Sequence, residues 1–266
     1  MKKISLLIIF CLFSVSAFSK PKKINQKPTN DFTTAKFKGV KATLIKEYSK
    51  DGLTKKQIAK LRDRTMSYGP SAVPALIHVM KAKDFPDRNK WLATFLLGKI
   101  VGKKSAPFIS RFIQHPNWVM RMASLKTLNA LKADKYNGLY AYALKDKSMI
   151  VRGQALENIR SMNLQSMAPA VWAMLYDKQN YHLPKKKTGK AKRTNLIKKV
   201  IRTVGDLKFS KAKTPLLTMI QKKKYKDIFD EMDYALSKIT GKVSPKGKTH
   251  IKKQFWKRYL MKETII

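Results

Sequence analysis

The side chains best suited to bind a ligand gather in the last third of the sequence, where positive charge is dense. Between Lys178 and Lys226 the chain carries 17 Lys or Arg residues and a single acid, Asp206. Clustered cations attract phosphates, sulfates and carboxylates, although such runs also serve solubility as an ordinary solvated surface. The candidate anion-binding patch consists of Lys185, Lys186, Lys187, Lys190, Lys192, Arg193, Lys198, Lys199 and Arg202.

Patterns that predict catalysis or metal binding are missing from the sequence. The four histidines, at positions 78, 115, 182 and 250, are scattered, and none stands at metal-ligand spacing from another. The sequence contains no Gly-rich phosphate loop, no serine-nucleophile elbow and no zinc-protease helix motif. The acidic residues are explained by helix ends and ion pairs. We therefore predict a protein that is not an enzyme, with no cofactor and no metal.

The charge of the whole chain gives two interpretations. The 266 residues carry a formal net charge of +42, and 48 of the 58 basic residues are lysine. Lysine is a mobile point charge, whereas arginine favours fork-like, base-specific contacts. The first interpretation is non-specific attraction to an anionic partner. The second is that the basic composition is a background property of the chain and serves no ligand.

An internal repeat of 31 residues predicts the elements that position these side chains. Its apolar residues step by three and four, so they form one stripe on a helix. Short apolar segments, which follow prolines at 74, 107, 169 and 215, supply a second helix per unit, because proline is favoured in a first helical turn. Pairs this short must stack to bury their apolar faces. With an offset of 31, Met120 falls on Val151, Leu125 on Leu156, Leu128 on Ile159 and Leu131 on Met162.

This pattern resembles the HEAT-repeat family in its short bacterial form, over roughly residues 70 to 240. The matching segments are Leu144-Lys145-Asp146 and Ile150-Val151-Arg152-Gly153-Gln154-Ala155-Leu156. The resemblance implies a ladder in which an Asp ending the first helix and an Arg early in the second join neighbouring units. It places Asp84, Asp146, Asp177, Arg121 and Arg152 on that ladder, with His115 at one acid position.

The fold class we predict is all-α, an armadillo/HEAT-like α-solenoid over residues 38–262. About five helical hairpins are expected, at 71–102, 104–132, 134–163, 165–205 and 211–240. Helices at 40–48 and 55–68 are expected to cap one end, and a helix at 249–262 the other. The fourth pair carries an insertion, residues 178–193, because its proline-to-proline step is 46 residues instead of 31. Insertions in solenoids map to loops, often on the binding face.

The first 19 residues read as a secretory signal peptide. Lys2 and Lys3 precede an apolar run, and small residues before Lys20 suit cleavage after Ser19, which predicts a periplasmic or secreted protein. The alternative is an uncleaved N-terminal anchor. Residues 20–37 read as a flexible basic leader. No other run is apolar enough to span a membrane, and Cys11 is the only cysteine, so a cleaved chain has no disulfide.

Three tryptophans, Trp91, Trp118 and Trp172, fall in or just before repeat helices. We expect them to pack between repeats, with an aromatic lining of the concave surface as the alternative.

These observations favour an exported scaffold that binds an anionic partner, an acidic protein or an envelope polymer, through a basic surface. The alternative is a solenoid that binds nucleic acid non-specifically, since phosphate contact dominates such affinity, with a likeness in fold to the HEAT-like DNA glycosylases. A third reading is an accessory subunit with no ligand of its own. The oligomeric state stays open.

Overall fold

The computed structural model describes residues 31–182 and 192–264. The predicted signal peptide lies outside these residues, and so do four lysines of the predicted patch, Lys185, Lys186, Lys187 and Lys190. The described chain is all-helical apart from one pair of two-residue strands.

Most of the helices come in consecutive pairs, a short first helix and a longer second one. The pairs are α3 (Val73–Lys81) with α4 (Asp87–Val101), α5 (Ala106–Ser110) with α6 (Trp118–Ala130), α7 (Asn137–Ala143) with α8 (Met149–Ser161), α9 (Ala168–Ala173) with α10 (Asn195–Asp206), and α11 (Lys213–Gln221) with α12 (Phe229–Thr240). Three further helices flank them: α1 (Asp31–Tyr48), α2 (Lys55–Ser67) and α13 (Thr249–Thr264). Pro74, Pro107 and Pro169 stand in the first turns of α3, α5 and α9, as their fixed backbone angle favours.

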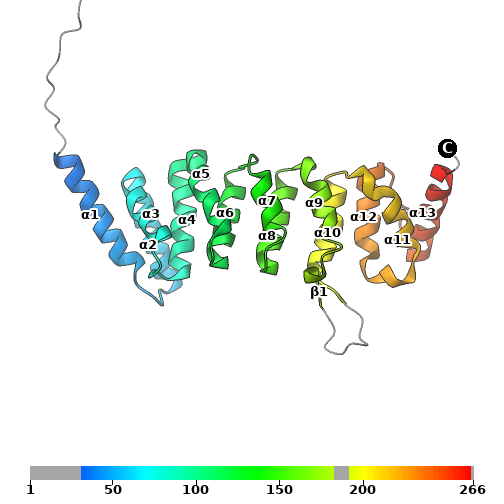
Figure 1. Cartoon of the computed structure of the whole chain (residues 1–266), viewed down its shortest axis with the longest axis horizontal. Helices are drawn as coiled ribbons and strands as arrows, with labels where there is room; N and C mark the ends of the chain where they lie inside the picture. The colour runs from blue at the N-terminus through cyan, green and yellow to red at the C-terminus, as the bar shows by residue number, and fades with distance from the viewer. Residues whose placement is uncertain (1–30, 183–191, 265–266) are drawn as a thin grey trace, which may run out of the picture.

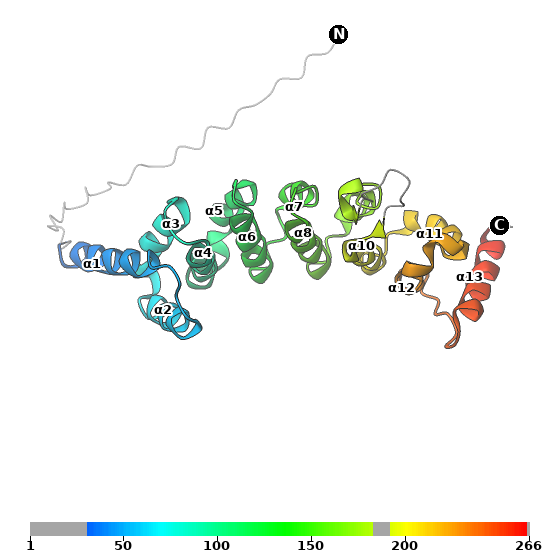
Figure 2. The same cartoon turned by 90° about the horizontal axis from the view of Figure 1, so that it is seen from below.

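The pairs stand side by side in an elongated row, with α1 and α2 at one end and α13 at the other (Figure 1). Seen from below, α3, α5, α7 and α11 form one layer, and the second helices α4, α6, α8, α10 and α12 form the other (Figure 2). The second helices contact one another in chain order from α4 to α12. The core therefore runs along the row between the two layers.

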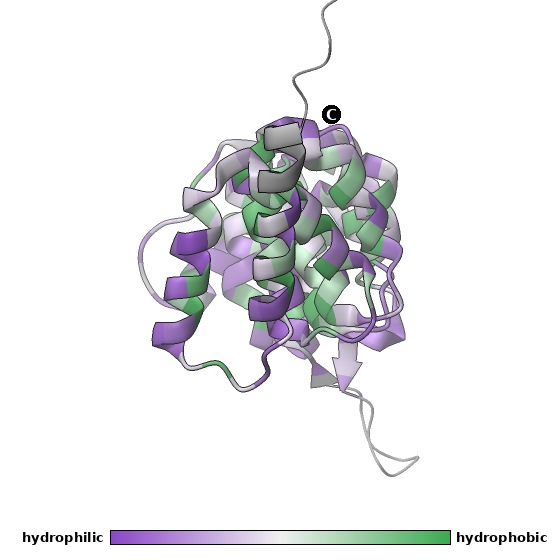
Figure 3. Cartoon of the chain, turned by 90° about the vertical axis from the view of Figure 1, so that its left-hand side faces the viewer, coloured by the Kyte–Doolittle hydropathy of each residue, from purple (hydrophilic) through white to green (hydrophobic). Residues whose placement is uncertain are grey.

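The repeated apolar stripe packs in this core. Leu97, Leu128 and Ile159, which occupy one position of the repeat on α4, α6 and α8, are all buried. Viewed from the α1 end, hydrophobic turns gather toward the middle of the stack and hydrophilic ones toward its outside (Figure 3). Close approach of α10 and α12 depends on Gly205, since a Cβ there would lie 2.6 Å from the Cα of Ala235.

The N-terminal end departs from the prediction in one respect. Helix α1 begins at Asp31, so residues 31–37 are helical and not part of a flexible leader. No Gly or Pro interrupts this segment, and the rest of α1 is anchored by burial of Leu44 and Tyr48. Thr54 caps α2 in a capping box with Gln57.

Helix α13 packs against α11 at the other end and begins at Thr249, as predicted. Its Trp256 is fully buried, and the indole Nε1–H donates to Oδ1 of Asp233 at 2.7 Å. The same carboxylate accepts hydrogen bonds from Ser244 Oγ at 2.7 Å and Lys252 Nζ at 2.8 Å. Within residues 31–182 and 192–264, no helix combines the length and apolarity needed to cross a membrane.

Candidate binding surface and pocket

A buried ion pair joins the second pair of helices to the third. Arg121 on α6 donates from Nε to Oδ2 of Asp146 at 2.6 Å and from Nη2 to Oδ1 at 2.7 Å. Its Nη1 donates to the backbone carbonyls of His115 and Pro116, each at 2.9 Å. The two side chains are only 6% and 4% exposed. The turn before α6 and the turn before α8 are thereby fixed to each other.

At the next rung Arg152 bonds to no carboxylate, although the sequence places both Asp146 and Asp177 on the ladder. Arg152 on α8 repeats the backbone contact, donating from Nη1 to the carbonyl of Asp146 at 2.6 Å. Its forward partners are Oδ1 of Asn180 and the carbonyl of Gln179, both at 2.8 Å, and not the carboxylate of Asp177. Asp177 instead accepts the backbone N–H of Gln179 at 2.9 Å. The longer turn in this pair brings Asn180, three residues further on, to the place of the acid.

Asp84, the first acid of the predicted ladder, makes no ion pair within the described chain. Lys90, six residues after it as Arg152 is after Asp146, donates to the carbonyl of Lys83 at 2.8 Å. Asp84 is exposed. The side chain of Asp84 cannot accept a hydrogen bond from the backbone two residues later, because that residue is Pro86, which has no N–H.

His115 takes over one role of the aspartate that it replaces. Its Nδ1 accepts the backbone N–H of Asn117 at 3.1 Å, as Oδ1 of Asp146 accepts that of Ser148 at 2.8 Å. Burial lowers the pKa of His115, which keeps the ring neutral and able to accept. His115 therefore forms the same turn as Asp146 does but provides no carboxylate for an ion pair.

The base of the insertion is tied into this frame. Asn180 is fully buried, and its Nδ2 donates to the carbonyl of Met174 at 2.9 Å. The carbonyl of Asn180 accepts from Thr194 Oγ1 at 2.7 Å. Two short strands follow, β1 (Tyr181–His182) and β2 (Lys192–Arg193), antiparallel with Tyr181 opposite Arg193. The insertion thus begins and ends as a paired ladder, where the sequence predicts only a loop.

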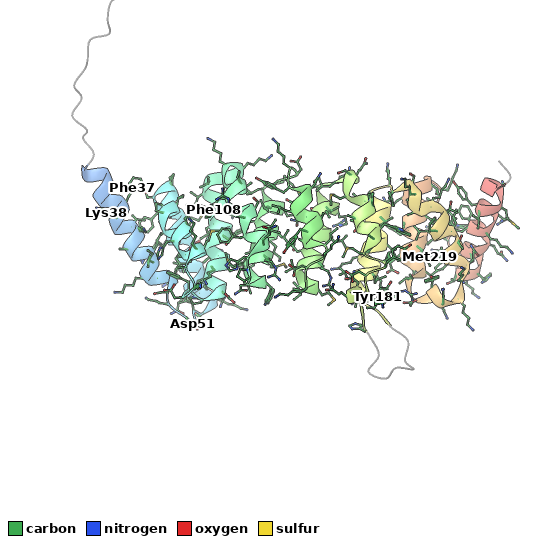
Figure 4. The ribbon with its side chains drawn as sticks, viewed as in Figure 1. Phe37, Lys38, Asp51, Phe108, Tyr181 and Met219 are labelled. Carbon is green, nitrogen blue, oxygen red and sulfur yellow. The ribbon has the colours of Figure 1, made fainter. Side chains whose placement is uncertain are left out.

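A pocket of ≈ 240 Å³ lies beside this base. Its walls carry four aromatic rings, and Ile197, Ile201 and Ile228 give it a buried aliphatic floor. Tyr181 from β1 and Met219 from α11 both line it, and Figure 4 labels these two side chains. The lining residues are Trp172, Leu175, Tyr176, Tyr181, Arg193, Ile197, Ile201, Met219, Tyr225 and Ile228.

Three of the rings make specific contacts that hold them in place. The hydroxyl of Tyr181 donates to the carbonyl of Leu175 at 2.6 Å, and burial raises the pKa of this tyrosine. The rings of Trp172 and Tyr176 meet edge to face, with centroids 6.4 Å apart. The pocket is therefore preformed.

Arg193 is the only cation among the residues that line this pocket. Its guanidinium carbon lies 4.8 Å from the ring centroid of Tyr225, and its Nη1 donates to Oδ1 of Asp227 at 2.9 Å and to the carbonyl of Lys224 at 3.2 Å. Within the described chain Nε and Nη2 make no hydrogen bond. Arg193 is therefore oriented by its surroundings and keeps two donors for a ligand.

The other described cations of the predicted patch point to a different part of the surface. Lys199 and Arg202 border a second pocket of ≈ 250 Å³ between the second helices, together with Glu157 and Asp206. Arg202 stacks on Tyr234 at 4.0 Å, and Lys198 Nζ lies 4.0 Å from Oε1 of Glu231. For Lys192 the structure defines only its place in β2. The described part of the patch is thus split between two faces, and its α10 cations stand next to acids.

Charge is distributed unequally between the two layers. The first helices α3, α5, α7, α9 and α11 contain no Asp or Glu, whereas the second helices α4, α8, α10 and α12 do and α6 does not. The turns after the first helices carry Asp84, Asp146, Asp177 and Asp227. We call the outer side of these first helices and the turns that follow them the first-helix layer. Its exposed cations include Lys81, Arg111 and Lys145.

Aromatic rings are interspersed with these cations. Tyr142 is 52% exposed and Tyr176 is 74% exposed. Lys81 Nζ lies 5.8 Å from the ring centroid of Phe108. A groove of ≈ 600 Å³ between α7 and α9 is bordered by Tyr142 and Lys145. The layer therefore combines positive charge with rings that an extended partner can contact.

The tryptophans do not all pack as expected. Trp91 is 40% exposed and Trp118 is 46% exposed, so the prediction of packing between repeats is wrong for these two. Trp118 is the first residue of α6 and Trp91 lies in the first turns of α4, where helix ends leave the rings partly in solvent. Trp172 is half-buried and lines the pocket.

Sequence reasoning found Arg193 and Trp172 but missed the three tyrosines that complete the pocket. Only the position of Tyr181 at the edge of the insertion signals a role. No group of three or more His, Cys, Asp or Glu in the described ranges is arranged to hold a metal ion. No protein-family model matches the chain, and no curated protein matches it either.

Proposed function

We propose that this protein is an exported, non-enzymatic α-solenoid scaffold of the HEAT type, which binds an anionic partner through the first-helix layer. The partner is an acidic protein or an anionic envelope polymer. The observation that carries this proposal is the absence of acid from all five first helices, in a chain whose formal net charge is +42. The N-terminal sequence pattern supports export.

The row of helix pairs suits this function physically. Stacked hairpins present an extended surface, so a long partner can contact several units at once. Each surface lysine contributes little alone, but a layer in which cations outnumber acids such as Asp84, Asp177 and Asp227 attracts an oppositely charged partner and speeds its encounter. Acids on the second helices neutralise part of the other layer, which directs the partner to the first helices.

Two triple variants test this assignment because they remove the same charge from opposite layers. One neutralises Lys81, Arg111 and Lys145 to Gln; the control neutralises Lys198, Lys199 and Arg202 to Gln. Binding of poly-L-glutamate, followed by fluorescence anisotropy, should weaken more in the first variant. The difference should be largest below ~0.1 M salt, where the Debye length exceeds ~10 Å. Thermal melting curves verify that both variants are folded.

Equal losses in the two variants would mean that net charge alone drives binding, which contradicts the proposal. Duplex DNA and uncharged dextran serve as comparison polymers. Tight binding to DNA without binding to poly-L-glutamate would favour the nucleic-acid alternative.

A further inference from the structure

The pocket beside β1 and β2 is a product of the insertion. Tyr181 and Arg193, which face each other across the strand pair, both line it. The insertion accounts for the step of 46 residues between prolines where the repeat has 31. Buried hydrogen bonds anchor the base of the insertion, and the insertion contributes one aromatic ring and one cation to the pocket. We therefore treat this pocket as a ligand site.

The walls select an apolar group. Aliphatic side chains make the floor, and the hydroxyl of Tyr181 is already used in its bond to Leu175. A sugar ring or another hydroxyl-rich group would leave several polar atoms without partners on that floor, which is unfavourable. The volume of ≈ 240 Å³ equals that of about eight water molecules, at roughly 30 Å³ each. It therefore admits one large side chain and not an extended chain.

The guanidinium of Arg193 selects an anion at the edge of the pocket. Planar guanidinium groups bind carboxylates through two parallel N–H bonds, and Nε with Nη2 forms such a pair of donors. The carboxylate of Asp227, which is 51% exposed, pairs with Nη1 and neutralises part of the positive charge of Arg193. The ammonium group of Lys224 offsets the charge of Asp227, because its Nζ lies 5.0 Å from the Tyr225 ring on which Arg193 also stacks. Lys222, Lys223 and Lys226, in the same turn as Lys224, are exposed and add positive charge to that turn.

We propose that this pocket captures the C-terminal residue of a partner protein, with its apolar side chain on the aliphatic floor and its free carboxylate on Arg193. A C-terminal residue places a carboxylate one carbon from its side chain, which matches a small apolar pocket with one cation at its edge. The inference rests on the proposed function, since it narrows the anionic partner to a protein. It also gives the partner a defined register on the first-helix layer.

Calorimetry with two peptides tests the proposal on the full chain. Both are N-acetylated Gly/Ser peptides that end in Leu; one has a free carboxylate and the other a C-terminal amide. We expect the free acid to bind about tenfold or more tightly than the amide, because charge-assisted hydrogen bonds are the stronger kind. Arg193→Met should remove that difference, and Arg193→Lys should restore part of it. Tyr176→Ala should weaken both peptides without unfolding the chain, since this ring is 74% exposed.

Arg202→Met is the matched control, because Arg202 stacks on Tyr234 on the opposite face as Arg193 does on Tyr225. It should leave peptide binding unchanged. Equal affinity for acid and amide, or equal losses in Arg193→Met and Arg202→Met, would overturn the proposal. Binding of adenosine monophosphate but of neither peptide would overturn it in favour of a nucleotide.

The pocket and the first-helix layer can fail separately. If neither peptide binds while poly-L-glutamate still discriminates between the triple variants, the pocket assignment is wrong and the scaffold stands. If the free-acid peptide binds while poly-L-glutamate does not, the layer assignment is wrong and the pocket stands.

Discussion

Truncation of one carboxylate, in Asp146→Ala, is the most direct test of what holds neighbouring helix pairs together. The variant leaves the guanidinium of Arg121 buried at 6% exposure without its counter-charge. Breaking a buried pair by removing one partner costs about 3–5 kcal/mol. For a chain of this size each kcal/mol corresponds to roughly 2–4 °C in Tm, so we expect a fall of about 6–20 °C.

Thermal unfolding followed by circular dichroism measures this fall, with two comparison variants. Glu157→Gln removes an exposed partner of Arg160, a pair whose side chains are 45% and 44% exposed, and should cost less than about 1 kcal/mol. The double variant Arg121→Met with Asp146→Leu removes both charges and should be closer to the wild type than Asp146→Ala is. If Asp146→Ala and Glu157→Gln have the same Tm, the buried ion pair does not hold neighbouring helix pairs together and this account of the ladder is refuted.

Two further predictions concern the packing of the last helices. Burial raises the pKa of Asp233, but hydrogen bonds from Lys252, Ser244 and Trp256 outweigh burial and hold the pKa below its usual value. The stability that the Asp233 carboxylate contributes is therefore present above pH ~4 and is lost as the pH falls through the depressed pKa. Between pH ~5 and ~3 the wild type should therefore lose more stability in urea titrations than Asp233→Asn does; parallel losses would contradict this. Gly205→Ala should cost about 1–3 kcal/mol by forcing α10 from Ala235, while Gly138→Ala, with nothing within 4 Å of its Cβ, should not destabilise, as melting curves will show.

The helix pairs could be predicted from the sequence because their signals are local. Apolar residues three and four apart define a helix face wherever that helix packs, and proline marks a first turn without reference to tertiary contacts. Leu97, Leu128 and Ile159 illustrate this, since a common repeat position became a common buried environment. The start of α1 was missed because residues 31–37 follow a lysine- and proline-containing segment and carry no helix-start signal of their own, so only the burial of Leu44 further along identifies the helix.

The candidate site was harder to predict because it depends on contacts between distant segments. Arg193 and Tyr225 are far apart in sequence and meet only when the turn after α11 packs beside β2. The charge run likewise predicts a single patch, yet folding sends Arg193 to one face and Arg202 to the other. A count of cations cannot show which of them will lie beside an acid, as Lys198 does beside Glu231.

The ladder and the pocket are connected through Asn180. At the rung before it, Asp146 cancels the charge of Arg121 inside the protein. At the rung of Arg152, by contrast, every acceptor is neutral: three backbone carbonyls and the amide oxygen of Asn180. This second guanidinium is 2% exposed, so its charge is weakly screened by solvent. With an amide in place of a directly bonded carboxylate, the charge of Arg152 is offset only through space, by Asp177 and Asp146, and it leaves positive potential at the base of the insertion, beside the strands that carry Arg193.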